Sequence, residues 1–174
     1  MKVIKYSVIP LLLGFIPFLW DGHISMVLNH YFSPEFFLSS HFFIIYIFLL
    51  TLDLPVKFYF LYLIGFGFIY DTYYFKTIGI AILTLPLLCY LLTQLCRLVK
   101  RNAYVDLLLV FLFLFLFDSL NFAFALFYGF TNESVTEFII YQLSPSLIFN
   151  ILIFILIRPF INKLFLYLSV DRFK

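Results

Sequence analysis

Six long apolar stretches, separated by short gaps in which basic residues alternate, constrain this 174-residue chain more than any motif does. Ten of the eleven Lys and Arg residues precede the first stretch or follow the second, fourth or sixth: Lys2, Lys5, Lys57, Arg97, Lys100, Arg101, Arg158, Lys163, Arg172 and Lys174. Only Lys76 breaks the alternation. Because Lys and Arg are retained on the cytoplasmic side of membranes, the pattern predicts a multi-pass membrane protein with both termini in the cytoplasm.

Composition supports a membrane protein and leaves no room for a soluble domain. Hydrophobic residues make up 65% of the chain and charged residues 11%, against about 45–50% and 25% in soluble domains. A helix that crosses the bilayer core needs about 20 apolar residues. We therefore predict an all-α fold with one transmembrane domain over residues 1–174, whose six helices cover residues 6–20, 36–54, 58–70, 77–96, 107–130 and 138–157.

The loops follow from these spans. Residues 21–35 form the longest predicted loop on the outer side of the membrane, with room for a short helix at the membrane interface. The basic residues are already assigned to cytoplasmic loops, so they do not indicate binding to nucleic acid.

An acidic residue near the middle of the fifth predicted span is the most unusual feature of the chain. A carboxylate such as Asp118 costs at least about 2.5–3.5 kcal/mol at that depth, so it must face protein or water. Asn121 lies three residues further on and therefore on nearly the same helix face. Two interpretations stay open: a site for an ion, proton, lipid headgroup or partner helix, or a hydrogen-bonded cluster that fixes helix packing.

A proline and an asparagine mark the sixth predicted span. Pro145 removes a backbone donor, so the span is either kinked there or begins there with Ser144 as its cap. Asn150 lies deeper in the span and is expected to pair with Asp118 or Asn121. A kink with one interhelical hydrogen bond is the favoured interpretation, ahead of a binding site.

Small and acidic residues surround the turn between the third and fourth spans. Gly65, Gly67 and Gly79 permit close helix approach. Asp71 is placed to cap the fourth helix or to accept from other backbone donors.

No residue pattern indicates a catalytic or metal centre. His23, His30 and His41 are too scattered for a metal site. With no catalytic motif in the chain, we predict a protein that is not an enzyme and that holds no cofactor or metal.

Taken together, these residues resemble the MreD family of bacterial cell-shape proteins. The resemblance is carried by Gly67, Asp71 and Gly79 in a G-x-x-x-D-x7-G pattern, by Asp118 in the fifth helix, and by Pro145 and Asn150 with Arg158-Pro159 at the end of the sixth. One departure is Leu63, where the family often has glycine.

This resemblance implies a multi-pass scaffold of the bacterial cytoplasmic membrane. Such a scaffold binds the single-span protein MreC and supports peptidoglycan synthesis and cell shape, in a machinery that includes MreB, a SEDS polymerase and a class B penicillin-binding protein. The chain also looks distantly similar in fold to the substrate-binding subunits of energy-coupling-factor (ECF) vitamin transporters.

Two other classes of function remain open. A small-molecule carrier would use Asp118, Asn121 and Asn150 to line a cavity open to the outside. A membrane enzyme or lipid translocase would use Asp71 together with Asp118, and it is the least favoured class.

Overall fold

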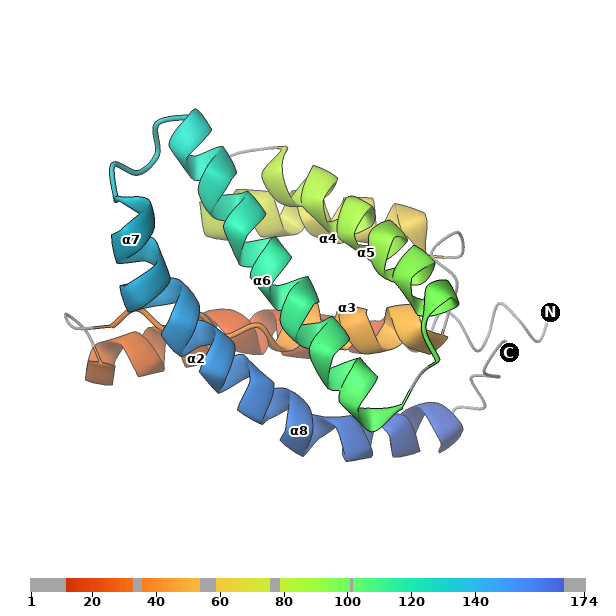
Figure 1. The fold of residues 1–174 in the computed structure, drawn as a ribbon. Coiled ribbons are helices and arrows are strands. Elements are labelled where there is room, and N and C mark those ends of the chain that lie inside the picture. Colours follow the sequence, from red (N-terminus) through yellow and green to blue (C-terminus); the bar gives the residue numbers. More distant parts are fainter. Residues whose placement is uncertain (1–11, 33–35, 54–58, 76–78, 101, 168–174) are drawn as a thin grey trace.

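A computed structural model describes residues 12–32, 36–53, 59–75, 79–100 and 102–167, and all regular secondary structure among them is helical. This confirms the predicted all-α class. The helices pack into one bundle (Figure 1) and are α2 (Phe15–Phe32), α3 (Phe42–Asp53), α4 (Phe60–Tyr70), η2 (Asp71–Phe75), α5 (Ile80–Leu98), α6 (Ala103–Phe127), α7 (Val135–Glu137), η3 (Phe138–Leu143) and α8 (Ser144–Tyr167). The π-helical turns η2 and η3 continue the helices beside them.

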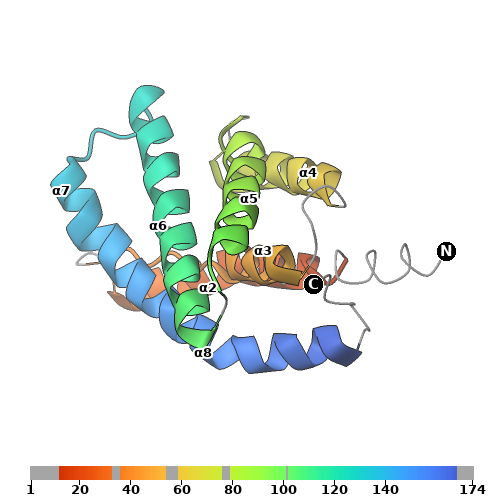
Figure 2. The same cartoon turned by 45° about the vertical axis from the view of Figure 1, so that its right-hand side comes forward.

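The centre of the bundle is the short helix α3. Residues 43–50 are each between 0 and 4% exposed, and a helix that is apolar on every side is stable only when it is surrounded. Four neighbours enclose it, namely α2, α5, α6 and α8, as the two views in Figure 1 and Figure 2 show. The apolar core of the protein is therefore built around α3.

Three helical segments among the described residues are long and apolar enough to cross a membrane: Ile80–Leu98, Ala103–Phe127 and Val135–Ile161. By contrast α3 has 12 residues, which is about 18 Å at 1.5 Å per residue. It is too short to cross a core of about 30 Å by itself. The predicted helix over residues 36–54 is wrong in its first part, because residues 36–41 are not helical.

The first predicted boundary is also wrong. Helix α2 continues past Trp20 to Phe32, so residues 21–32 are helix instead of the predicted outer loop. The charge that suggested a loop belongs to Asp21, which is 2% exposed and faces the interior. The beginning of that span and residues 33–35 lie outside the described residues.

The sixth helical segment also differs, since α8 continues to Tyr167, ten residues past the predicted end at Ile157. The boundaries of the third, fourth and fifth helices agree better with prediction. Helices α4, α5 and α6 each begin and end within four residues of the predicted spans.

Around Pro145 the chain stays helical. Ser144 has helical backbone angles, φ −62° and ψ −50°, so the predicted cap at Ser144 is wrong. The helical path begins earlier, where Ser134 and Glu137 form a capping box. The π-helical turn η3 ends two residues before Pro145, and such wider turns are a common site of helix distortion. The kink at Pro145 stays a prediction.

Candidate functional site

The non-helical segment 36–41 enters the bundle between α2 and α8, where its backbone must find partners. An unpaired backbone group in an apolar interior is costly. Each N–H from residue 37 to residue 43 donates to an oxygen on another element: the Tyr141 carbonyl and the side chains of Asn29, Ser146, Ser25, Asn150 and, for the last two, Asp21. These polar side chains hold an irregular backbone inside an apolar bundle.

Asp21 from α2 caps the start of α3. Its carboxylate accepts from the Phe42 N–H at 2.6 Å, the Phe43 N–H at 2.9 Å and the Ser40 hydroxyl at 2.9 Å. The first N–H groups of a helix have no partner within the helix. A buried carboxylate supplied by a different helix therefore completes α3.

Asn150 from α8 holds the same segment from the other side. Its side-chain oxygen accepts from the His41 N–H at 2.8 Å, and its amide donates to the Ser39 carbonyl at 2.7 Å. The expected pairing of Asn150 with Asp118 or Asn121 is therefore wrong. The side-chain amide of Asn150 bonds backbone groups instead: two on the extended segment and the Ser146 carbonyl of its own helix.

Asp71 caps α5 in the way that Asp21 caps α3, which confirms its predicted capping role. It is fully buried and accepts from the N–H groups of Gly79, Ala81 and Ile82 at 2.8, 2.7 and 3.2 Å. Gly79 has φ of 123°, a conformation that glycine adopts without strain.

Gly67 brings α4 against the start of α5. A Cβ at Gly67 would lie 2.7 Å from the Ile82 Cα, closer than van der Waals contact allows. The predicted role of Gly67 in close helix approach is confirmed, whereas it is wrong for Gly65 and Gly79, where a Cβ would have nothing within 4 Å.

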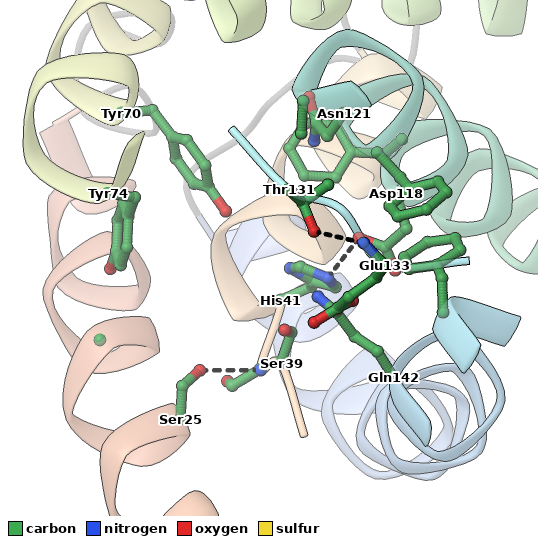
Figure 3. A pocket seen from close by; sticks show the side chains of 16 residues that line it. Ser25, Ser39, His41, Tyr70, Tyr74, Asp118, Asn121, Thr131, Glu133 and Gln142 are labelled. Carbon is green, nitrogen blue, oxygen red and sulfur yellow. Dashed lines mark hydrogen bonds and ion pairs between the residues drawn. The ribbon is translucent and has the colours of Figure 1, made fainter. Parts of the chain in front are cut away.

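Asp118 faces a cavity of about 450 Å³ that is bounded by α2, the 36–41 segment, α4, η2, α6, the 130–134 loop and η3. Its Oδ1 lies 2.8 Å from the His41 Nε2, as Figure 3 shows. Asn121 lines the same cavity, whereas Asn150 does not. The carrier alternative called for a cavity lined by Asp118, Asn121 and Asn150, and the cavity is lined by the first two of them.

At the opposite end of α6, Arg158 pairs with Asp106 and also donates to the Ala103 carbonyl at 3.4 Å. This contact joins the beginning of α6 to the later part of α8. Within the described residues no three His, Cys, Asp or Glu side chains gather closely enough to hold a metal ion.

The family described as rod shape-determining protein MreD matches residues 5–168. The chain belongs to the MreD family. It is 33% identical over 152 residues to the cell shape-determining protein MreD of Streptococcus pneumoniae (strain ATCC BAA-255 / R6), covering 87% of this chain and 92% of that relative. No solved structure matches the chain.

Membership of the MreD family supports a role in cell shape. The structure shows where the residues that carry the family resemblance lie. Gly67, Asp71 and Gly79 act together at one helix start, whereas Asp118 and Asn121 lie on the cavity and Pro145 follows the π-helical turn.

Sequence reasoning missed Asp21 and His41 in this MreD chain. Asp21 follows an apolar stretch and was assigned to a loop on the basis of its charge. The polar run Ser39, Ser40 and His41 inside a predicted span was the available signal for a break in the second helix.

Proposed function

We propose that this chain is a non-enzymatic scaffold of the bacterial cell-shape complex that binds MreC in the cytoplasmic membrane and supports peptidoglycan synthesis. The observation that carries the proposal is the MreD family match across residues 5–168. MreB, a SEDS polymerase and a class B penicillin-binding protein are the further partners that we propose for the assembly.

The physical basis for a scaffold is that the buried polar groups are paired inside the bundle, while the outer faces of the helices are apolar. Asp21, Asp71 and Asn150 satisfy buried backbone groups within the bundle. The outer faces of the long helices carry exposed apolar side chains, among them Leu87 on α5, Leu108 on α6 and Leu152 on α8. Such faces suit contact with lipid or with a partner helix.

Capture of the tagged chain from its own membrane in mild detergent tests this proposal. We expect MreC to co-purify with the wild-type chain and not with an unrelated tagged membrane protein. Three variants then locate the contact by adding bulk to one outer face each: Leu87→Trp, Leu108→Trp and Leu152→Trp. We expect one of them to lose most of the captured MreC while the other two retain it.

Two results would count against this proposal in different ways. Absence of MreC from the wild-type eluate would remove the scaffold role. Full retention by all three variants, each with wild-type thermal stability, would exclude these faces as the contact. Recovery of ATPase subunits in place of MreC would instead favour a subunit of a small-molecule transporter, the alternative function that the cavity supports.

We also propose six membrane crossings with both termini in the cytoplasm. The pairing of Arg158 with Asp106 supports this arrangement, because it brings the basic gap after the sixth span beside the basic gap after the fourth. By the positive-inside rule that end faces the cytoplasm, and the cavity end faces outward.

Cysteine labelling tests the orientation. In a Cys89→Ala, Cys96→Ala background, we expect Glu133→Cys to react with a membrane-impermeant maleimide in spheroplasts. We expect Lys100→Cys to react only after the membrane is permeabilised. Equal labelling of both positions in intact spheroplasts would contradict this topology.

A further inference from the structure

The cavity beside Asp118 has more acidic than basic side chains in its lining, because His41 is its single basic group. Its lining includes two carboxylates, Asp118 and Glu133, and contains no Lys or Arg. Even with a proton on both nitrogens of His41, the lining would stay net negative. Its volume, about 450 Å³, lies in the range of small-ligand sites, about 300–1,000 Å³.

Buried acceptors in this cavity lack hydrogen-bond donors. Asp118 Oδ2, Asn121 Oδ1 and His41 Nδ1 have no hydrogen-bond partner among the described residues. His41 is 4% exposed and Asn121 is 9% exposed, so bulk solvent does not fully hydrate them. In the neutral tautomer of His41 that carries its proton on Nε2 toward Asp118, Nδ1 is an acceptor, whereas with both nitrogens protonated Nδ1 is a donor. Buried polar groups of this kind are usually satisfied by a bound molecule or ordered water.

Aromatic rings form much of the remaining wall. The cavity is lined by Phe117, Phe122 and Phe138, and by Tyr70 and Tyr74 on the facing side, and Figure 3 shows the two tyrosines across the cavity from Asp118. Aromatic faces attract cations because the face of the ring is electron-rich. The aromatic wall therefore favours a positively charged ligand, as the carboxylates do.

One chemical group meets all three conditions. A primary ammonium group has a positive charge, three N–H donors and no acceptor, whereas a phosphate or carboxylate would meet two carboxylates and at most the one positive charge of His41. We propose that this cavity binds the primary ammonium group of a small organic amine, with Asp118 as its counter-ion and Asn121 as a further acceptor. The site is independent of partner binding on the outer helix faces.

Two sources could supply this ammonium group: a free small amine, or the headgroup of an aminolipid such as phosphatidylethanolamine. The chemistry at Asp118 is the same in both. The phosphate of a lipid would have to stay outside the cavity, since Glu133 also lines it.

The test uses the purified full-length chain without partners, so that its result is separate from capture of MreC. Binding of 2-phenylethylammonium is measured by calorimetry in detergent, beside the neutral analogue 2-phenylethanol. Retention of phosphatidylethanolamine against phosphatidylcholine is measured by native mass spectrometry from mixed nanodiscs. Phosphatidylcholine is the matched lipid because its quaternary ammonium has no N–H donor.

The main variant is Asp118→Asn, which keeps the shape of the side chain and removes its charge. We expect the wild type to bind the ammonium probe or the aminolipid, and Asp118→Asn to weaken that binding about tenfold or more, as loss of a charged hydrogen bond predicts. Asn121→Leu provides a second test if Asp118→Asn does not fold. Glu137→Gln is the control, because Glu137 is exposed and lies outside the cavity lining.

Each outcome decides the proposal. Selective binding of the free amine, or selective retention of phosphatidylethanolamine, supports the site and identifies the source of the ammonium group. In either case the binding must be lost in Asp118→Asn and kept in Glu137→Gln. Equal affinity for the ammonium and the alcohol, unchanged binding in folded Asp118→Asn, or no binding of either probe would overturn it.

Discussion

Replacing Asp71 with alanine is expected to lower the free energy of unfolding by at least about 3 kcal/mol, since each buried donor left without a partner costs about 1–3 kcal/mol. Three N–H groups at the start of α5 donate to this carboxylate, and Asp71 is fully buried. The alanine variant offers those groups no acceptor. The measurement is the midpoint of thermal unfolding of the purified protein in detergent, beside the yield of folded protein.

Two further variants separate capping from charge. Asp71→Asn keeps one acceptor oxygen, so we expect its unfolding midpoint to fall between wild type and Asp71→Ala. Glu137→Gln removes a carboxylate from an exposed capping box, in which glutamine is also accepted, and we expect little change. An Asp71→Ala variant as stable as wild type would show that the cap contributes nothing to the fold.

Replacing Gly67 with alanine is expected to destabilise the protein by about 1–3 kcal/mol, the usual effect of forcing an extra carbon into a packed contact. The new Cβ would lie 2.7 Å from the Ile82 Cα, 2.8 Å from the Ile82 nitrogen and 2.9 Å from the Ala81 carbonyl oxygen. These are backbone atoms and cannot rotate away. The same two residues donate N–H groups to Asp71, so displacing them also disturbs the cap.

Gly65 provides the matched control on the same helix. Nothing lies within 4 Å of a Cβ built at Gly65, and alanine is a better helix former than glycine by up to about 1 kcal/mol. We therefore expect Gly65→Ala to leave the unfolding midpoint unchanged or slightly raised. Equal destabilisation by both substitutions would mean that close approach to α5 is not the reason for glycine at position 67.

The capping role of Asp71 and the helical state of α6 could be predicted from sequence, because both depend on residues that are close together in the chain. Asp71 lies eight residues before Gly79 and in the short gap between the predicted third and fourth helices, so its capping role needs only knowledge of where the fourth helix begins. The run of Leu and Phe in α6 resembles a strand over a short distance, but its length without a turn signal predicts a helix, and Ala103–Phe127 is helical.

The rest of the site depends on contacts between distant parts of the chain. His41 and Asn150 are 109 positions apart, and nothing in the local pattern of either residue indicates the other. Asp21 was assigned to an outer loop because charge usually marks a loop in a membrane protein. Its burial becomes intelligible only when the N–H groups of Phe42 and Phe43 are found beside it.

The sequence by itself determined the class of this protein: a helical membrane protein, from the apolar stretches, the alternation of basic gaps and the helix-length runs that follow from them. These are properties of short segments in a bilayer. The tertiary structure decided that the second span begins as extended backbone, that Asn150 holds that backbone, and that His41 contacts Asp118 at the wall of a cavity. Those features arise because every backbone group buried in an apolar bundle needs a partner, and only the packed helices determine which side chain supplies it.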